Sequence, residues 1–393
     1  MKLKLPESGF PGQFIAPKPF FVGVLLGFLI CCVLGFICSQ NQKIENFKRF
    51  HFYISPYTQY FPSLGQMVSL VKPARKDQTI VIVGGNSLFN GFGQRTEELW
   101  SEKLKQDLGD KYFVVNYSFD GAVPFEGGSW VAEMLLKQNR KVIYITTAEP
   151  RRISAPDGLL LRREFFDFKN HGLLLNSSKR SQTLDEHMNA SHSNFDQSLL
   201  DLSLGKQVDL YTCSTELWQW VGHNLFFTVW CSGTHPNFLA PRASFGDTYR
   251  PHLNLDGSFL ESKKNELIGE QNSVAFRNAA GDWEAFSRSW ADADENYQTI
   301  PQELLRHSIV FVPRHSPLIL NRFSSDQLEK YDGILEISMK RWKDLGADSA
   351  VIGNGFKPDD YLDMGHFSET GGSMVAHMVA EKIRESARRL DYE

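Results

Sequence analysis

Three residues, one early in the chain and two near its end, have the types that acyl-transfer chemistry uses. Ser87 follows an apolar run and two glycines in VIVGGNSLFNG, residues 81–91. A serine hydroxyl is a weak nucleophile until a neighbouring base takes its proton. Asp363 and His366, three residues apart in DYLDMGHFSETGG, offer a histidine with an acid to orient it. The sequence therefore predicts a Ser87–His366–Asp363 proton relay, with a plain glycine turn as the alternative for residues 84–87.

The glycine-rich turn does not match the common nucleotide-binding motifs. A phosphate-binding loop needs G-x-x-x-x-G-K-[ST], and no lysine stands at the required place. The glycines at 84, 85, 91 and 93 also lack the G-x-G-x-x-G spacing of a dinucleotide site. No Cys/His cluster has zinc spacing, and no calcium-loop pattern occurs, so we expect neither a metal nor another cofactor.

Charge and composition describe an ordinary globular chain. The 393 residues contain 42 basic and 46 acidic side chains, for a net charge of −4, and no long Lys/Arg run. This balance does not favour a nucleic-acid partner.

The elements that must position these residues alternate between strand and helix. We expect strands at residues 79–83, 112–117, 142–146, 308–312 and 350–352, and helices at residues 96–108, 128–139, 326–345 and 371–390. Such alternation predicts an α/β fold, with a parallel sheet covered by helices on both faces. Ligands bind at the carboxyl ends of the strands in such sheets. Ser87 and the loops after the third and fourth strands should therefore share one rim.

A long insertion interrupts the alternation after the third strand. Residues 149–306 are irregular, and because the insertion starts at the binding rim it is expected to form a lid or side wall there. A packed subdomain without contact to the site is the alternative. Cys213 and Cys231 lie in this insertion, as a disulfide or as two free thiols.

An apolar segment near the N-terminus predicts a membrane anchor. Residues 20–38 carry no charge, and as a helix they would span about 28 Å, close to the thickness of a bilayer. We interpret them as an uncleaved single-pass helix; a cleaved signal is the alternative. The lysines and arginine that flank the segment are nearly balanced, so they do not set the orientation. The chain would then comprise a tail (1–19), the anchor, a stalk (39–78) and a domain (79–390).

Three short blocks, in the correct order on matching elements, resemble the SGNH (GDSL) hydrolase family. Gly85-Asn86-Ser87 stands where the family has its GDS block, NYSFDGA follows the second strand like the family's second block, and DMGH precedes the last helix. The resemblance covers roughly residues 78–148 and 308–390 and implies a flavodoxin-like, SGNH-type sheet.

The resemblance also implies roles for the site residues. Ser87 would be the nucleophile, His366 the base and then the acid, and Asp363 the group that orients the ring. The backbone N–H groups of Ser87 and Gly121 would form the oxyanion hole.

Two positions depart from the family pattern. The family has an asparagine after the third strand as a further oxyanion donor, whereas this chain reads TTAEP and has Glu149, whose carboxylate cannot donate. Losing one such donor typically costs about 10²- to 10³-fold in rate. Asn86 replaces the usual aspartate beside the nucleophile.

The resemblance and the anchor together predict an enzyme of the cell envelope. The chain would be a serine esterase or O-acyltransferase that acts on acyl esters of envelope glycans, with its domain outside the cytoplasm, in the periplasm. A membrane acyl-donor protein would be a partner for the transferase. Arg314 and His315, after the fourth strand, could bind the substrate or be solvated or ion-paired. The alternative function is an inactive SGNH-fold binding or scaffold protein in a polysaccharide assembly.

Overall fold

The computed structural model describes the greater part of the chain. The described residues are 17–39, 52–55, 58–60, 64–95, 98–119, 122, 124, 126–149, 168, 172–175, 257–285 and 300–392. Gly121, Cys213, Cys231 and most of the 149–306 insertion lie outside them.

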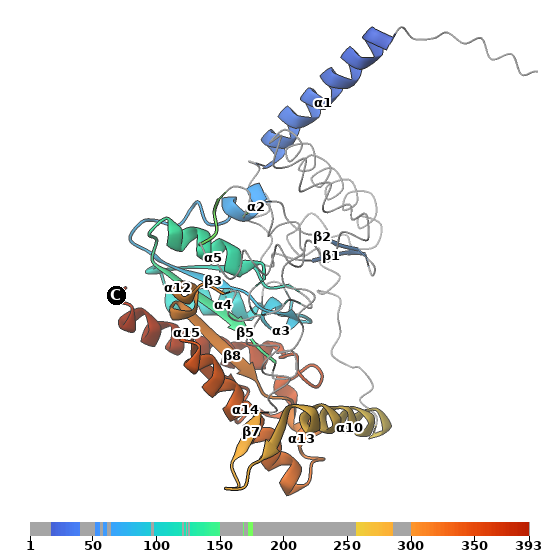
Figure 1. Ribbon diagram of the computed structural model, residues 1–393, viewed down its shortest axis with the longest axis vertical. Helices are drawn as coiled ribbons and strands as arrows, with labels where there is room; N and C mark the ends of the chain where they lie inside the picture. The colour runs from blue at the N-terminus through green and yellow to red at the C-terminus, as the bar shows by residue number, and fades with distance from the viewer. Residues whose placement is uncertain are drawn as a thin grey trace, which may run out of the picture.

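Five parallel strands form the central sheet (Figure 1). In chain order they are β3 (Thr79–Val83), β4 (Tyr112–Asn116), β5 (Val142–Thr147), β8 (Ser308–Pro313) and β9 (Asp348–Ile352). Their order across the sheet is β4-β3-β5-β8-β9, and each neighbouring pair is parallel. β3, the first strand of this sheet in chain order, therefore lies between β4 and β5, and the later strands are added on both sides of it. This arrangement confirms the expected α/β fold with a parallel sheet.

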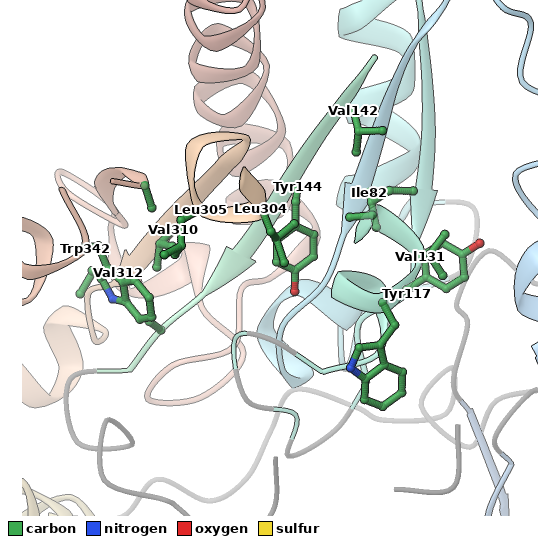
Figure 2. Packing of buried hydrophobic residues seen from close by; sticks show 14 of the residues in the cluster. Ile82, Tyr117, Val131, Val142, Tyr144, Leu304, Leu305, Val310, Val312 and Trp342 are labelled. Carbon is green, nitrogen blue, oxygen red and sulfur yellow. The ribbon is translucent and has the colours of Figure 1, made fainter. Parts of the chain in front are cut away.

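One face of the sheet packs against α5 (Gly128–Lys137), α12 (Gln302–Arg306) and α14 (Ser325–Asp344). Alternate side chains of a strand point to opposite faces, so each central strand sends one set to this core. Figure 2 shows Val131 of α5 on the same side of this core as Ile82 and Val142, and Trp342 of α14 beside Val312 of β8. Burial of these apolar side chains holds the three helices against the sheet.

The other face packs against α3 (Ser87–Asn90), α4 (Trp100–Leu108) and α15 (Glu369–Arg389). Val83, Ile145 and Phe311 point to this side and belong to the same apolar cluster as the buried stripe of α15. The most extensive described contact between helices joins α15 to α4, so the C-terminal helix lies beside the first long helix of the domain. Through this packing the segment before α15 reaches the end of β3.

The described part of the insertion adds α10 (Gly257–Val274) and a hairpin of β6 (Ala275–Arg277) and β7 (Trp283–Ala285). α10 packs on α13 (Pro317–Leu320) and on α14. A short 3₁₀ helix, η7 (Pro358–Asp360), follows β9 and leads into the segment that holds Asp363. Helix α10 of the insertion therefore packs beside β8 and β9, whereas Phe168 and residues 172–175 of the insertion contact α5.

The region before the sheet contains α1 (Pro17–Ser39), the antiparallel pair β1 (Phe52–Ser55) and β2 (Thr58–Tyr60), and α2 (Leu64–Ser69). In α1 the described side chains are those of residues 19–30 and 33. Within the described part of the chain, no helix meets the combined length and hydropathy needed to cross a bilayer.

The end of the expected stalk, residues 39–78, is part of the domain. Met67, Val71 and Ala74 are buried in the core beside α5 and β3. The Tyr117 hydroxyl donates a hydrogen bond to the Met67 carbonyl at 2.7 Å, which fixes α2 to the end of β4. The prolines of this segment suggested a linker, but the apolar spacing at 67, 71 and 74 is that of a helix or turn lying on a core.

The close contact between α15 and η7 can be tested by adding one methyl group at Gly371. A Cβ atom at Gly371 would lie 2.0 Å from the Asp360 carbonyl oxygen, so Gly371→Ala must push α15 away from η7. We expect a loss of about 1–3 kcal/mol in the free energy of unfolding, measured by urea denaturation.

Gly269, on α10, is the matched control. A Cβ atom there would meet nothing within 4 Å, so Gly269→Ala should be stabilising by up to about 1 kcal/mol through helix propensity. Equal effects of the two substitutions would contradict the contact between Gly371 and η7.

Candidate active site

The turn that carries Ser87 requires both glycines before it. A Cβ atom at Gly84 would lie 2.2 Å from the Tyr144 hydroxyl oxygen on β5. Gly85 has a φ of +96°, in the left-handed region that side chains disfavour, and its Cβ would lie 2.7 Å from Thr147 Oγ1. The backbone can therefore pass close to β5 and turn sharply only without side chains at these two positions.

Asn86 then starts the short helix α3 and sets the position of Ser87. Its Oδ1 accepts a hydrogen bond from the Leu88 N–H at 3.1 Å, which is a helix N-cap. The loop after β4 supports the same turn, because the Phe119 N–H donates to the Gly85 carbonyl at 3.1 Å. Ser87 thus stands as the first residue of α3, at the carboxyl end of β3.

Asp363 and His366 lie in a small loop closed by backbone contacts. Tyr361 and Phe367 form an isolated antiparallel bridge, and the Leu362 N–H donates to the His366 carbonyl at 2.8 Å. Asp363 Oδ1 accepts from the backbone N–H groups of Gly365 and His366, both at 2.8 Å. The carboxylate therefore organises the loop that displays the histidine.

The three predicted residues come together. His366 Nδ1 lies 2.7 Å from Asp363 Oδ2, and His366 Nε2 lies 2.8 Å from Ser87 Oγ. A carboxylate can only accept hydrogen bonds, so Nδ1 carries the proton and Nε2 keeps a lone pair for the serine hydroxyl. The Phe92 ring packs against the imidazole at a centroid distance of 4.9 Å.

The ionisation of Asp363 suits the orientation of the histidine. Burial by itself would raise the pKa of Asp363, but the hydrogen bonds from the His366 ring and from two backbone N–H groups lower that pKa below its ordinary value. The side chain is 14% exposed. It is therefore a carboxylate at neutral pH, and it favours the protonated form of the neighbouring ring during proton transfer.

A cavity of about 290 Å³ opens over Ser87 and His366. Glu149 after β5 and Arg314 and His315 after β8 line it, together with the loop that carries Asp363. All of these follow the carboxyl ends of strands, as the expected sheet requires.

Helix α10 supplies the remaining wall of the cavity. Phe259, Lys263, Glu266 and Leu267 line it from the insertion. Helix α10 of the insertion is thus a side wall of the site, as expected, whereas the other described residues of the insertion after Glu149 do not line the cavity. The sequence reasoning missed these four residues, although apolar residues at 259, 260, 267 and 268 have helical spacing.

Arg314 and His315 lie where they were expected, but both have protein partners. The Arg314 guanidinium pairs with Asp332 and lies over the Tyr331 ring, 5.4 Å from its centroid. The backbone N–H of His315 donates to the Tyr331 hydroxyl at 2.8 Å, and its Nδ1 lies 2.9 Å from the same oxygen. The charge of Arg314 is therefore balanced by Asp332, and an anion would have to compete for it.

Glu149 stands after β5, where the family resemblance implies an asparagine that donates to the oxyanion. Its Oε1 accepts a hydrogen bond from the Asn86 side-chain N–H at 2.8 Å. The backbone donor expected at Gly121 lies outside the described residues. Of the two expected oxyanion donors, the structure thus places Ser87 in the site.

In the part of the chain that the structure describes, no three His, Cys, Asp or Glu side chains gather closely enough to hold a metal ion.

The chain was also compared with models of protein families, with curated proteins and with solved structures, and none of them matched.

Proposed function

We propose that this protein is an SGNH-type serine esterase or O-acyltransferase that forms an acyl-enzyme at Ser87. One observation carries the proposal. The hydroxyl of Ser87, the imidazole of His366 and the carboxylate of Asp363 lie in hydrogen-bonded sequence, at 2.8 and 2.7 Å, beside a cavity. This is the arrangement by which a base activates a serine and an acid orients the base.

The chemistry proceeds in two transfers. His366 Nε2 takes the hydroxyl proton as Ser87 Oγ attacks the ester carbonyl, and the imidazolium that forms is stabilised by Asp363. When the tetrahedral intermediate collapses, the same proton passes to the departing alcohol oxygen and the acyl group remains on Ser87. Water or a sugar hydroxyl then attacks the acyl carbonyl and gives its proton to His366. When this second intermediate collapses, the bond to Ser87 Oγ breaks, His366 returns the proton to that oxygen, and the acyl group leaves on the entering hydroxyl.

The cavity fits a polar substrate of modest size. Its walls combine carboxylate and cationic groups (Glu149, Glu266, Lys263, Arg314) with the exposed ring of Phe259. Hydroxyl-rich molecules can hydrogen-bond to such groups and pack against the ring. We therefore propose an acyl ester of a glycan as substrate.

Turnover of p-nitrophenyl acetate with and without added glycan separates the esterase from the transferase, because only a transferase is accelerated by the acceptor.

A non-catalytic scaffold is the second candidate, and Glu149 is the observation that favours it. A carboxylate beside a developing oxyanion opposes the negative charge instead of stabilising it. Against this candidate stands the complete hydrogen-bonded relay, which a scaffold would not need.

The enzyme and the scaffold differ in their reaction with a fluorophosphonate probe. An activated serine attacks this probe, so we expect labelling of the wild-type chain and its loss in Ser87→Ala. Ser262→Ala is the matched control, because Ser262 is exposed on α10. Absence of labelling in a folded wild-type protein would support the scaffold.

Two adjacent lysines of α10 test whether the insertion wall contacts the substrate. Lys263 lines the cavity and pairs with Glu266, whereas Lys264 pairs with Glu261 and does not line the cavity. We expect Lys263→Ala to raise KM for a glycan ester about tenfold, the equivalent of one charge-assisted hydrogen bond, with kcat retained. Lys264→Ala should leave KM at the wild-type value. A similar KM in both variants would argue against substrate contact at α10.

We further propose that residues 20–38 anchor the chain in the cytoplasmic membrane, with the domain in the envelope. The absence of charge in this segment supports the proposal. The full chain is expected to resist alkaline extraction from membranes and to keep these residues in its intact mass. Release by alkaline buffer, or a mass that lacks the segment, would show that it is not an anchor.

A further inference from the structure

Asn86 is buried beside the nucleophile, with each side-chain atom assigned to a partner. The residue is 4% exposed. Its Oδ1 faces two donors, the Leu88 N–H at 3.1 Å and the Thr147 hydroxyl at 3.1 Å. Since a backbone N–H can only donate, the oxygen must face Leu88 and the amide nitrogen must face the other way.

The amide nitrogen of Asn86 faces the Glu149 carboxylate. Asn86 Nδ2 donates to Glu149 Oε1 at 2.8 Å, across the gap between the ends of β3 and β5. An amide N–H can only donate, so the Glu149 oxygen is the acceptor of this hydrogen bond. A neutral donor at position 86 therefore meets a carboxyl acceptor at position 149.

From these contacts we propose that Asn86 and Glu149 form a positioning pair for Ser87, in which residue 86 must be an amide because residue 149 is a carboxylate. The proposal rests on the proposed serine chemistry. The pair connects the two positions at which the chain departs from the expected pattern. An acid was expected beside the serine and an amide after the third strand. In this chain the amide stands beside the serine, as Asn86, and the acid stands after the third strand, as Glu149.

The pair acts on the reaction through the geometry of the turn. Asn86 is the residue before Ser87 and caps the helix that Ser87 begins. Tension or repulsion at Asn86 therefore moves both the hydroxyl and the backbone N–H of Ser87. A displacement of about 1 Å at a reacting group can cost about 10²-fold in rate.

Two substitutions and their combination test the pair. Asn86→Asp keeps the helix cap but sets a second carboxylate against Glu149. Glu149→Gln removes the charge and keeps an oxygen that can accept from Asn86, so it is the reference for the cycle. In the double variant the hydrogen bond reverses its direction, because the carboxylate introduced at position 86 accepts from the amide introduced at position 149. The same carboxylate also accepts from the Leu88 and Thr147 donors, so every partner stays satisfied.

We expect Asn86→Asp to lower kcat for p-nitrophenyl acetate about 10- to 100-fold with little change in KM. Adding Glu149→Gln to this variant should recover at least tenfold of the loss. Asn90→Asp is the matched control. Asn90 is a buried asparagine of the same helix whose Nδ2 donates to the Ser118 carbonyl. Glu149→Gln should not recover any loss in that background.

The midpoint of thermal unfolding provides a readout that does not depend on the reaction. Asn86→Asp should lower the midpoint at pH 8, well above the ordinary pKa of an Asp or Glu side chain, and the double variant should restore it. The proposal is overturned if Asn86→Asp matches the wild type in both kcat and midpoint, or if Glu149→Gln fails to restore either of them. If Ser87→Ala retained full probe labelling, the proposed function would fail, and the unfolding midpoints would still decide whether the two residues form a pair.

Discussion

The hydrogen bond between Asp363 and His366 is the constraint on which the site depends. One carboxylate oxygen accepts two backbone N–H groups and shapes the loop, and the other holds the imidazole at 2.7 Å. Because the carboxylate can only accept, it determines which ring nitrogen faces Ser87. A single side chain thus sets loop shape, ring orientation and tautomer together.

The parallel sheet brings this pair to Ser87, which is 279 residues from His366 in sequence. β3 ends at the turn with Ser87, and β9 ends shortly before η7 and the Asp363 loop. These strands are separated in the sheet by β5 and β8, so α15 has to bring its preceding loop back across the sheet edge. Its packing against α4 and on the β-sheet face does this, and burial of its apolar stripe supplies the free energy.

The cavity is built from two parts of the chain, the loops at the end of the sheet and helix α10 of the insertion. The sheet loops provide the nucleophile, the base and Glu149, while α10 of the insertion provides a wall with a ring and a charged pair. The contact between Asn86 and Glu149 connects two neighbouring strand ends directly beside the nucleophile. The carboxylates of the cavity can accept hydrogen bonds and its cationic groups can donate them, which is consistent with the hydroxyl-rich substrate proposed above.

The sequence by itself determined the five strands of the central sheet and the order of the main helices, because buried strands and amphipathic helices have distinct apolar spacing. It also indicated Ser87, Asp363 and His366, because a serine needs a base and the base needs an acid to orient it, and the blocks that hold them stand in the order of the family they resemble. Helix α10 was missed, and the packing of residues 67–74 was taken for a stalk, since a short apolar pattern does not say what it packs against. Only the tertiary structure decided that Arg314 is paired with Asp332 and that Asn86 faces Glu149. Those contacts join residues 18 and 63 positions apart, and their distances depend on how the chain folds back on itself.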